Sequence, residues 1–265
     1  MALEREKTEQ MQVVIGRNPV LEAFKSGKEI DTLYIAKGER QGIVSKIAAL
    51  ARSAGVVIKE VSPQKLDSLS GGAAHQGVAA LLCCEAYADV SDILARAEDR
   101  KEPPFLVIAD EIEDPHNLGA LIRTAETAGA HGVIIPKRRS ASLTSIVYKT
   151  SAGAVSHIPV ARVANLPSVM EELKKKNIWI YAADMDGEPW CTLDYSGGVA
   201  LVIGSEGNGL GRLVREKCDF FVSLPMRGKI TSLNASVAGG ILMYEITRQR
   251  MGLAAKQNGG CHGSV

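Results

Sequence analysis

From residue 105 onward, short apolar runs alternate with segments of helical periodicity, and this alternation constrains the fold more than any other feature of the sequence. Near-continuous apolar strands between helices are typical of a mainly parallel sheet covered on both faces. We therefore predict an α/β fold for this part of the chain. The expected strands span 105–109, 133–136, 178–182, 199–203 and 220–224, and the expected helices span 118–128, 166–176, 213–217 and 235–250.

A smaller β/α unit is predicted ahead of this region from the same kind of alternation. Asn18 and Ser62 each precede a proline, so each is expected to cap the start of a helix. The expected strands span 12–15, 32–36, 56–61 and 76–84, and a further helix is expected at 43–54.

These two units are predicted to be separate domains joined by a linker. The linker contains a charged, helix-like segment at 92–101 and ends at the prolines 103–104, which block helix continuation. Glycines near the end of the chain predict a mobile tail. The predicted boundaries are 11–85 for the first domain, 86–104 for the linker, 105–252 for the second domain and 253–265 for the tail.

Charge and cysteine content narrow the range of partners. Lys and Arg total 31 against 30 for Asp and Glu, so any site for a polyanion must be a local patch. The 5 cysteines lack zinc-ligand spacing, which favours free thiols and no metal. No apolar run approaches the roughly 20 residues that span a bilayer, so we expect a cytoplasmic protein without a membrane segment.

The turns that follow the strands of the second domain are the first place to look for a site, because ligands of open α/β sheets bind at the carboxyl ends of strands. The segment 114–123 follows one such strand and opens a helix. Asn117 has the residue type of a helix cap, and capping alone would explain it. Arg123 could reach back toward the start of the helix, where an anion is favoured.

A second turn, 203–211, contains four glycines that permit positive φ angles and close approach to a ligand. It carries neither the dinucleotide fingerprint nor a phosphate-binding lysine. Glu206 in its middle argues against a phosphate ligand, because a carboxylate repels an anion. A plain tight loop remains an alternative interpretation of this turn.

A third turn, 223–236, leaves a strand, passes Arg227 and offers Ser232 and Asn234 at the start of the last helix. Either polar residue could be only a cap. A basic cluster follows another strand, which suggests a local anion-binding surface despite the balanced net charge. This cluster consists of Lys137, Arg138 and Arg139.

Together the three turns closely resemble the three motifs of the SpoU (TrmH) group of SPOUT RNA methyltransferases. The first domain is similar to the small RNA-binding domain, itself like ribosomal protein L30e, that precedes the catalytic domain of bacterial 23S rRNA guanosine 2'-O-methyltransferases. Segments 15–20 and 75–77 carry this second, shorter resemblance. The three motifs are Asn117-x-Gly119-x-x-x-Arg123, Ile203-Gly204-Ser205-Glu206-Gly207-x-Gly209, and Leu224-Pro225-Met226 through Ser232-Leu233-Asn234-Ala235-Ser236.

The resemblance implies S-adenosylmethionine as methyl donor and a ribose 2'-hydroxyl of RNA as acceptor. It also implies a homodimer and a SPOUT domain with a C-terminal trefoil knot, a topology that general folding rules exclude by default. In such enzymes the cofactor is held largely by backbone groups of the second and third motifs. The implied cofactor contacts are Gly204, Leu224 and Leu233, followed by Ile203, Gly207 and Met226.

Arg123 occupies the position of the family's proposed catalytic residue. A guanidinium has a pKa above about 12 and no acceptor while charged, so it is a poor base. We expect Arg123 to bind the phosphate beside the target ribose and to stabilise the developing alkoxide. Asn117, Ser232 and Asn234 are expected to orient the ribose, and Glu206 to hold Arg123 or to shape its loop.

The RNA target is expected to be a guanosine of 23S rRNA, because the related tRNA enzymes usually lack the extra first domain. A tRNA substrate and a catalytically inactive RNA-binding protein remain alternatives, whereas a Rossmann-type dinucleotide enzyme would need the absent glycine fingerprint. The expected RNA contacts are Arg17 and Asn18 in the first domain and Lys137, Arg138, Arg139 and Arg227 in the second.

Overall fold

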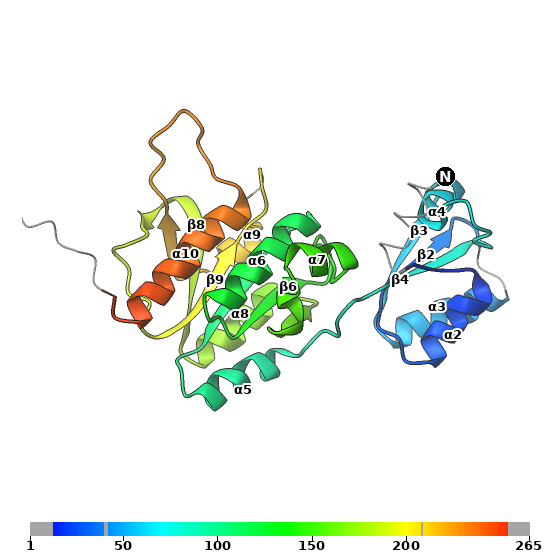
Figure 1. Ribbon diagram of the computed structural model, residues 1–265, viewed down its shortest axis with the longest axis horizontal. Helices are drawn as coiled ribbons and strands as arrows, with labels where there is room; N and C mark the ends of the chain where they lie inside the picture. Colours follow the sequence, from blue (N-terminus) through cyan, green and yellow to red (C-terminus); the bar gives the residue numbers. More distant parts are fainter. Residues whose placement is uncertain (1–12, 40–41, 208, 254–265) are drawn as a thin grey trace, which may run out of the picture.

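The computed structural model describes residues 13–39, 42–207 and 209–253, which form two domains joined by an extended segment (Figure 1). Residues 11–12 of the predicted first domain lie outside the described residues. So does the predicted mobile tail, apart from Leu253. Within the described ranges, no helix is both long enough and apolar enough to cross a membrane.

The first domain has a mixed sheet in the strand order β1-β4-β2-β3, in which β2 and β3 are parallel and the other pairs are antiparallel. Leu33, Ile47 and Ala80 belong to its buried core, which lies between this sheet and two of the helices. The elements are β1 (Val13–Ile15), α2 (Arg17–Lys25), β2 (Ile30–Ala36), α3 (Ile43–Ser53), β3 (Val57–Val61), α4 (Pro63–Ser70) and β4 (Val78–Leu82).

One of the two predicted helix caps in this domain is wrong. Helix α2 begins at Arg17, and its cap is Gly16, which has a φ of 95° that few other residues adopt. Asn18 therefore lies inside the first turn instead of in front of it. The other prediction is confirmed, because the Ser62 side chain accepts a hydrogen bond from the Lys65 amide at 3.4 Å.

The segment predicted as a linker is helical and packed. Helix α5 (Val90–Arg100) begins where the Asp92 carboxylate accepts from the Asp89 amide at 2.9 Å. Its Ile93 is fully buried in the core of the second domain, directly against Gly132, where a larger residue would clash. The segment is thus attached to the second domain, although the domain boundaries themselves remain a prediction.

The second domain contains a sheet whose described strands follow the order β10-β8-β9-β5-β6-β7, with every pair parallel. This arrangement confirms the predicted α/β fold with a mainly parallel sheet. The elements are β5 (Phe105–Ala109), α6 (Pro115–Thr127), β6 (Gly132–Pro136), α7 (Ser145–Thr150), η1 (Ala154–Ser156), β7 (Val160–Val163), α8 (Leu166–Lys175), β8 (Ile178–Pro189), β9 (Gly198–Ile203), α9 (Arg212–Arg215), β10 (Phe220–Ser223) and α10 (Ala235–Arg250).

Helices cover both faces of this sheet, as near-continuous apolar strands require. Val107 points to the face that packs against α6 and α10, whereas Ile108 points to the face covered by α5 and α8. Helices α6 and α10 lie side by side (Figure 1), and the Thr247 hydroxyl donates to the Ala128 carbonyl at 2.7 Å. Gly239 permits this approach, because a Cβ there would lie 2.7 Å from the Leu121 side chain.

Candidate active site

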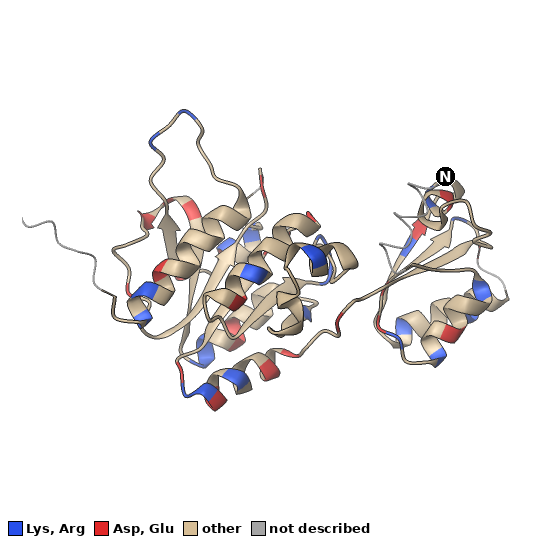
Figure 2. Cartoon of the chain, viewed as in Figure 1, with Lys and Arg blue, Asp and Glu red and all other residues tan. Residues whose placement is uncertain are grey.

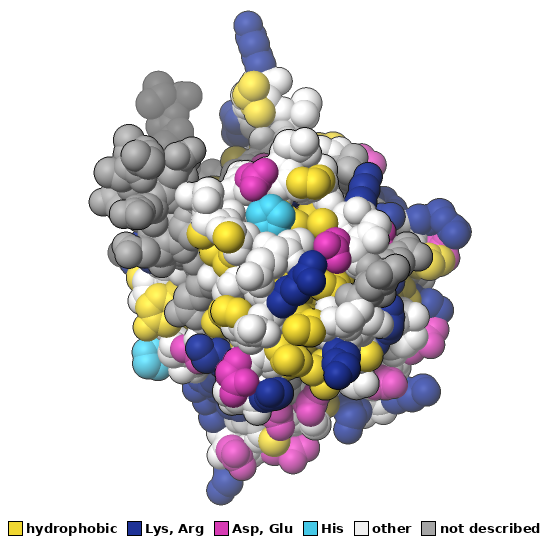
Figure 3. All heavy atoms as spheres, turned by 90° about the vertical axis from the view of Figure 1, so that its right-hand side faces the viewer, with side chains coloured by type: hydrophobic (Ala, Val, Ile, Leu, Met, Phe, Trp, Pro, Cys, Tyr) yellow, Lys and Arg dark blue, Asp and Glu magenta, His cyan; other side chains and the backbone are white. Residues whose placement is uncertain are grey.

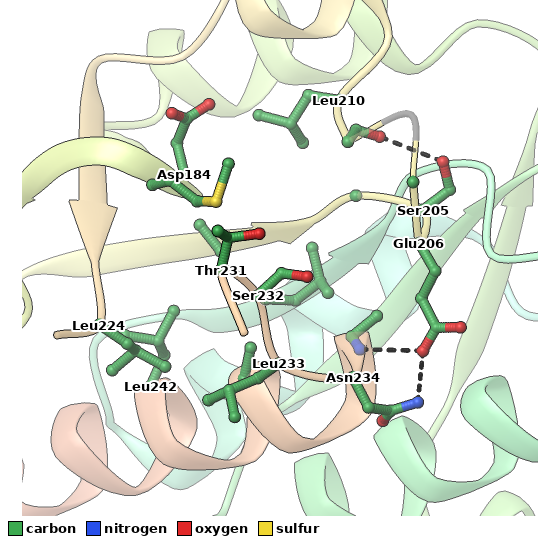
Figure 4. A pocket seen from close by; sticks show the side chains of 18 of the residues that line it. Asp184, Ser205, Glu206, Leu210, Leu224, Thr231, Ser232, Leu233, Asn234 and Leu242 are labelled. Carbon is green, nitrogen blue, oxygen red and sulfur yellow. Dashed lines mark hydrogen bonds between the residues drawn. The ribbon is translucent and has the colours of Figure 1, made fainter. Parts of the chain in front are cut away.

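A cavity of about 680 Å³ lies at the carboxyl ends of β9 and β10, beside the middle of β8 and the start of α10 (Figure 4). This is the edge of the sheet where the polar turns were expected. The apolar part of the cavity wall includes Leu224, Leu233 and Leu242, and the side chains of Thr231 and Ser232 add hydroxyl groups to the lining. The volume falls in the range of about 300–1,000 Å³ that is typical of small-molecule sites.

The glycine-rich turn after β9 forms one wall of the cavity. Ser205 and Gly209 exchange two backbone hydrogen bonds, of 2.9 and 3.0 Å, which close a tight loop. A Cβ at Gly204 would lie 2.5 Å from the Gly209 carbonyl carbon, so only glycine fits that position. Gly207 has a φ of 86°, which also favours glycine.

Three predicted site residues meet beside this turn. The Glu206 carboxylate accepts hydrogen bonds from the side-chain amides of Asn117, at 3.2 Å, and of Asn234. It also accepts from the Ala235 amide at 3.3 Å, and the Asn234 amide donates to the Asn117 side-chain oxygen at 2.9 Å. Figure 4 shows Glu206 reaching down to the start of α10. We call Asn117, Glu206 and Asn234 the polar cluster.

The cap of α6 differs from the expectation. Asp114 caps this helix by accepting from the His116 amide at 2.9 Å, and Pro115 is the first helical residue. Asn117 is therefore not the cap, and its buried side chain is available for the polar cluster. Asn234 does cap α10, because its side-chain oxygen accepts from the amides of Ser236 and Val237.

Two other candidates lie apart from the polar cluster. Arg123 is exposed on α6; its backbone carbonyl accepts from the Thr127 hydroxyl at 3.1 Å, but its guanidinium makes no hydrogen bond or ion pair with any residue that the structure describes. Glu206 was expected to hold Arg123 or to shape its loop, and in the structure it is bonded to Asn117, to Asn234 and to the start of α10, not to Arg123. Ser232 lines the cavity instead of joining the cluster (Figure 4).

All predicted cofactor-contact residues line the same cavity. They come from two segments that are separated in the sequence and meet at the carboxyl ends of β9 and β10. Backbone groups of both segments thus border one space. These residues are Ile203, Gly204, Gly207, Leu224, Met226 and Leu233.

The sequence did not indicate that β8 contributes to the cavity. The pairing of β8 with β10 shifts register between Phe221 and Val222, which leaves the middle of β8 unpaired there. Asp184 and Met185 lie in this stretch and line the cavity. The predicted strand ended at residue 182. Asp184 follows directly after it, and a polar residue just beyond the predicted end of a strand is the signal that could have identified it.

Asp110, at the end of β5, anchors the far side of the glycine-rich turn. Its carboxylate accepts from the Gly211 amide at 2.8 Å and is almost completely buried. Burial raises the pKa of Asp110, while the bond from Gly211 opposes this effect. The turn is thus fixed at one end by β9 and at the other by β5.

The predicted basic residues of the second domain differ in their partners and exposure. Lys137 binds the Gly55 carbonyl of the first domain, and Arg139 is paired with Glu111 at 2.8 Å. Arg138 is exposed. Arg227 lies in the long loop between β10 and α10, where Figure 2 shows basic positions at the far end.

Arg17 and Asn18, the expected RNA contacts of the first domain, lie in the first turn of α2. The Arg17 guanidinium donates to the Gln76 carbonyl at 2.9 Å and to Glu39 at 3.0 Å. Asn18 is exposed beside it. Basic, acidic and apolar side chains are interspersed over the face of this domain that Figure 3 presents. Among the residues described, no group of three or more His, Cys, Asp or Glu could hold a metal ion.

Comparison with known proteins identifies the family. The family model described as the SpoU rRNA Methylase family matches residues 104–244, which is more than half of the chain. The chain belongs to this family. A second model, described as RNA 2'-O ribose methyltransferase substrate binding, matches residues 13–83. The protein is therefore a SpoU/TrmH-family RNA methyltransferase, and methyltransferases of this family use S-adenosylmethionine.

A relative from Bacillus subtilis (strain 168), YacO, is described as a TrmH family tRNA/rRNA methyltransferase. It is 48% identical over 244 residues, which cover 92% of this chain and 98% of the relative. The match therefore includes both domains.

Two solved structures are similar over both domains as well. The SpoU methyltransferase AviRb from Streptomyces viridochromogenes, in complex with AdoMet, has a TM-score of 0.58 and 27% identity, and the match covers 92% of this chain and 91% of AviRb. An AdoMet-bound rRNA methyltransferase from Sinorhizobium meliloti has a TM-score of 0.54 and 26% identity, and the match covers 96% of this chain and 92% of that protein. These neighbours support the SPOUT methyltransferase fold.

Proposed function

We propose that this protein methylates the 2'-hydroxyl of a ribose in RNA, with a guanosine of 23S rRNA as the target. The observation that carries the proposal is the polar cluster, which lies directly beside a cavity lined by both glycine-rich and apolar turns. An apolar cavity next to a polar cluster suits the alignment of a donor with a polar acceptor.

The residues that line the cavity fit S-adenosylmethionine. Gly204 and Gly207 offer backbone without side chains, and Leu224 and Leu233 offer apolar contact. Asp184 supplies a carboxylate of the sign that favours a cationic ligand. When bound, S-adenosylmethionine supplies an electrophilic methyl group.

The polar side chains would then act on the acceptor. Asn117 and Asn234 would orient the ribose together with Ser232, while Glu206 fixes both asparagines. Arg123 would bind the phosphate next to the target ribose and stabilise negative charge on the oxygen. Its guanidinium is exposed and has no partner among the residues that the structure describes, so it is available for that role.

Two observations support ribosomal RNA as the target: the match of the first domain to a substrate-binding family model, and the description of a structural neighbour. The first domain matches the substrate-binding model, and the neighbour from Sinorhizobium meliloti is an rRNA methyltransferase. YacO is described as acting on tRNA or rRNA, so tRNA is the alternative target. RNA contacts by Arg17, Asn18, Lys137, Arg138, Arg139 and Arg227 belong to the same proposal, as does a cytoplasmic location, where ribosomal RNA is modified.

A homodimer and a C-terminal trefoil knot complete the proposal. Helix α10 carries the exposed apolar side chains Val237, Ile241 and Tyr244, next to the exposed Leu233 at the cavity rim. An apolar row beside a functional cavity suits a second copy of this chain. The knot is expected from the resemblance to SPOUT methyltransferases, and the cavity lies where the turn after β9, the loop after β10 and the start of α10 meet.

The test is methyl transfer from labelled S-adenosylmethionine to protein-free 23S rRNA and to bulk tRNA, followed by mapping of the modified nucleotide. Incorporation at one ribose of a 23S guanosine supports the proposal. Incorporation into the ribose of tRNA alone would support 2'-O-methylation but reject 23S rRNA as the target. Methyl groups on bases would reject 2'-O-methylation itself. Arg123→Lys should leave measurable activity with altered pH dependence, since lysine keeps the charge but loses the fixed fork of donors.

A further inference from the structure

Two consecutive residues of the connecting segment are bonded to different domains. The Cys83 amide donates to the Glu29 carbonyl of the first domain at 2.9 Å. The next amide, that of Cys84, donates to the Leu143 carbonyl of the second domain at 2.8 Å. The connection therefore has no slack at this point, and the geometry of the junction is set by the residues around it.

A buried ion pair joins the two domains at this junction. Asp31, at the start of β2, is 2% exposed and pairs with Arg162 of β7, whose side chain is 14% exposed. The second carboxylate oxygen of Asp31 accepts from the Thr32 hydroxyl at 2.7 Å. A buried charge whose partner is removed is costly, so opening this junction requires either water to enter or two charges to remain unpaired.

Tyr87, in the connecting segment, completes what we call the junction cluster (Asp31, Tyr87 and Arg162). The Arg162 guanidinium carbon lies 4.1 Å from the centre of the Tyr87 ring, a cation–π contact. The Tyr87 hydroxyl donates to Asp31 at 3.4 Å and accepts from the Leu143 amide at 3.1 Å. Burial, and then the charge of Asp31, raises the pKa of Tyr87, so the hydroxyl keeps its proton.

The junction cluster lies at the functional edge of the second sheet. Arg162 is paired with Ile135 near the carboxyl end of β7, and Lys137, just after β6, binds the Gly55 carbonyl of the first domain. The carboxyl ends of parallel strands share one edge, and the cavity opens at that edge. The first domain is thus attached on the β7 side of the sheet that carries the cavity (Figure 1).

We propose that the Asp31–Arg162 ion pair, stacked on Tyr87, is an interdomain lock that positions RNA held by the first domain relative to the methyl-transfer site. Domains of one chain move relative to each other by default unless their interface is extensive. A lock of this kind fixes the distance between the RNA contacts of the first domain and the methyl-transfer site. It therefore determines which ribose of a folded RNA reaches that site. Asp31 and Arg162 are positioning residues, since they act through the domain that binds RNA, and this role rests on the proposed function.

The test compares Asp31→Asn, Arg162→Gln and the double variant Asp31→Asn/Arg162→Gln. Each single variant leaves one charge buried without its partner, whereas the double variant restores a neutral pair. Each single variant should raise KM for a 23S rRNA transcript about tenfold, because small misplacements of a substrate are expensive. The affinity for S-adenosylmethionine should not change, and the double variant should fall between the single variants and the wild type.

Hydrogen exchange measures the lock without RNA. Peptides that cover 83–88 and 141–145 should exchange faster in both single variants, because they contain the junction amides of Cys84 and Leu143. Lys217→Gln is the matched control, since it breaks an ion pair with Glu171 inside the second domain. That control should change neither exchange at the junction nor KM for RNA. Thermal unfolding of every variant identifies any loss of folding, and the double variant keeps the test valid if a single variant unfolds.

Three results would overturn the lock or its role. Unchanged exchange at the junction in both single variants shows that there is no lock. Faster exchange with an unchanged KM for the transcript shows that the pair joins the domains without positioning RNA. If the wild-type protein methylates neither 23S rRNA nor tRNA, the proposed function fails separately, and the exchange experiment still decides whether the lock exists.

Discussion

The two domains use their glycine-containing turns for different purposes. In the first domain, Gly16 and Gly77 adopt positive φ angles, and the Arg17 side chain between them bonds to Gln76 and Glu39. In the second domain, the turn that contains Gly204 forms one wall of a cavity, and its Glu206 side chain bonds to residues at the starts of α6 and α10. A motif can therefore hold a loop together or border a site, and its hydrogen-bond partners distinguish the two cases.

The difference has a physical origin in the sheets. All described strands of the second sheet run in parallel, so their carboxyl-end turns meet at one edge. The first sheet is mixed, and its turns are divided between both ends. The following predictions test this contrast, from the largest expected effect to the smallest.

Gly204→Ala should be the most damaging substitution in the cavity wall. The new Cβ would lie 2.5 Å from backbone atoms of Gly209, and overpacking of this kind costs about 1–3 kcal/mol. Titration calorimetry should show a loss of S-adenosylmethionine binding of about 100-fold or more, as expected when a binding wall shifts by an ångström. Gly228→Ala, where a Cβ would meet nothing within 4 Å, is the matched control and should bind normally. Equal affinity in both variants would contradict the role of the turn.

Glu206→Gln should lower kcat about 10- to 100-fold, because a neutral amide oxygen accepts the bonds from the two asparagines more weakly than the charged carboxylate does. KM for S-adenosylmethionine should change little, because the glycine-rich backbone is retained. Single-turnover methyl transfer to RNA measures the effect. Glu216→Gln, which alters an exposed pair with Arg212, should be close to wild type. A wild-type rate for Glu206→Gln would remove the polar cluster from the chemistry.

Arg17→Ala should lower the stability of the first domain, apart from the RNA contact that the proposed function assigns to this side chain. It removes a hydrogen bond to the Gln76 carbonyl and a partly exposed pair with Glu39, for which a loss of about 1 kcal/mol is reasonable. Asn18→Ala, at the neighbouring exposed position, should leave the unfolding midpoint unchanged. Denaturant unfolding compares the two. If Arg17→Ala keeps full stability, the hydrogen bonds of this side chain do not hold the turn of the first domain together, and the contrast fails.

The smallest expected effect concerns His131, which is completely buried in the second domain. Its Nδ1 accepts from the Phe105 amide at 2.9 Å, and burial lowers the pKa of His131 from its ordinary value of 6.5. The unfolded chain therefore takes up the proton first, so stability is lost as the pH falls below about 6.5. Thermal unfolding between pH 5 and 8 should show this slope for the wild type and a flatter one for His131→Gln. Identical slopes would contradict the assignment.

Much of the fold could be predicted because its strands and helices follow clear periodicities. The bounds of β5 and α10 agree with the prediction, since both are delimited by prolines or by a capping asparagine. Strand β7 was missed, because Arg162 interrupts a short apolar run that flanking turns do not mark. Arg162 is accommodated there by Asp31 of the other domain and by the Tyr87 ring, contacts that no local pattern reveals.

The site could be predicted in part for the same reason. Spacing and residue type singled out Glu206, Asn117 and Asn234, which the fold brings together. The sequence could not show that Asp114 would cap α6 and release Asn117, since both residue types cap helices well. Asp184 was missed because the register shift in β8 depends on pairing with β10, which is a long-range event.

The most direct test of the account is hydrogen exchange of the wild-type protein with and without S-adenosylmethionine. The account predicts protection of peptides that cover 203–207 and 224–235, which line the cavity. It predicts unchanged exchange in 75–78 of the first domain, where the turn residues bond to one another. Saturating S-adenosylmethionine without protection in the two cavity segments would contradict the claim that these turns form the cofactor site.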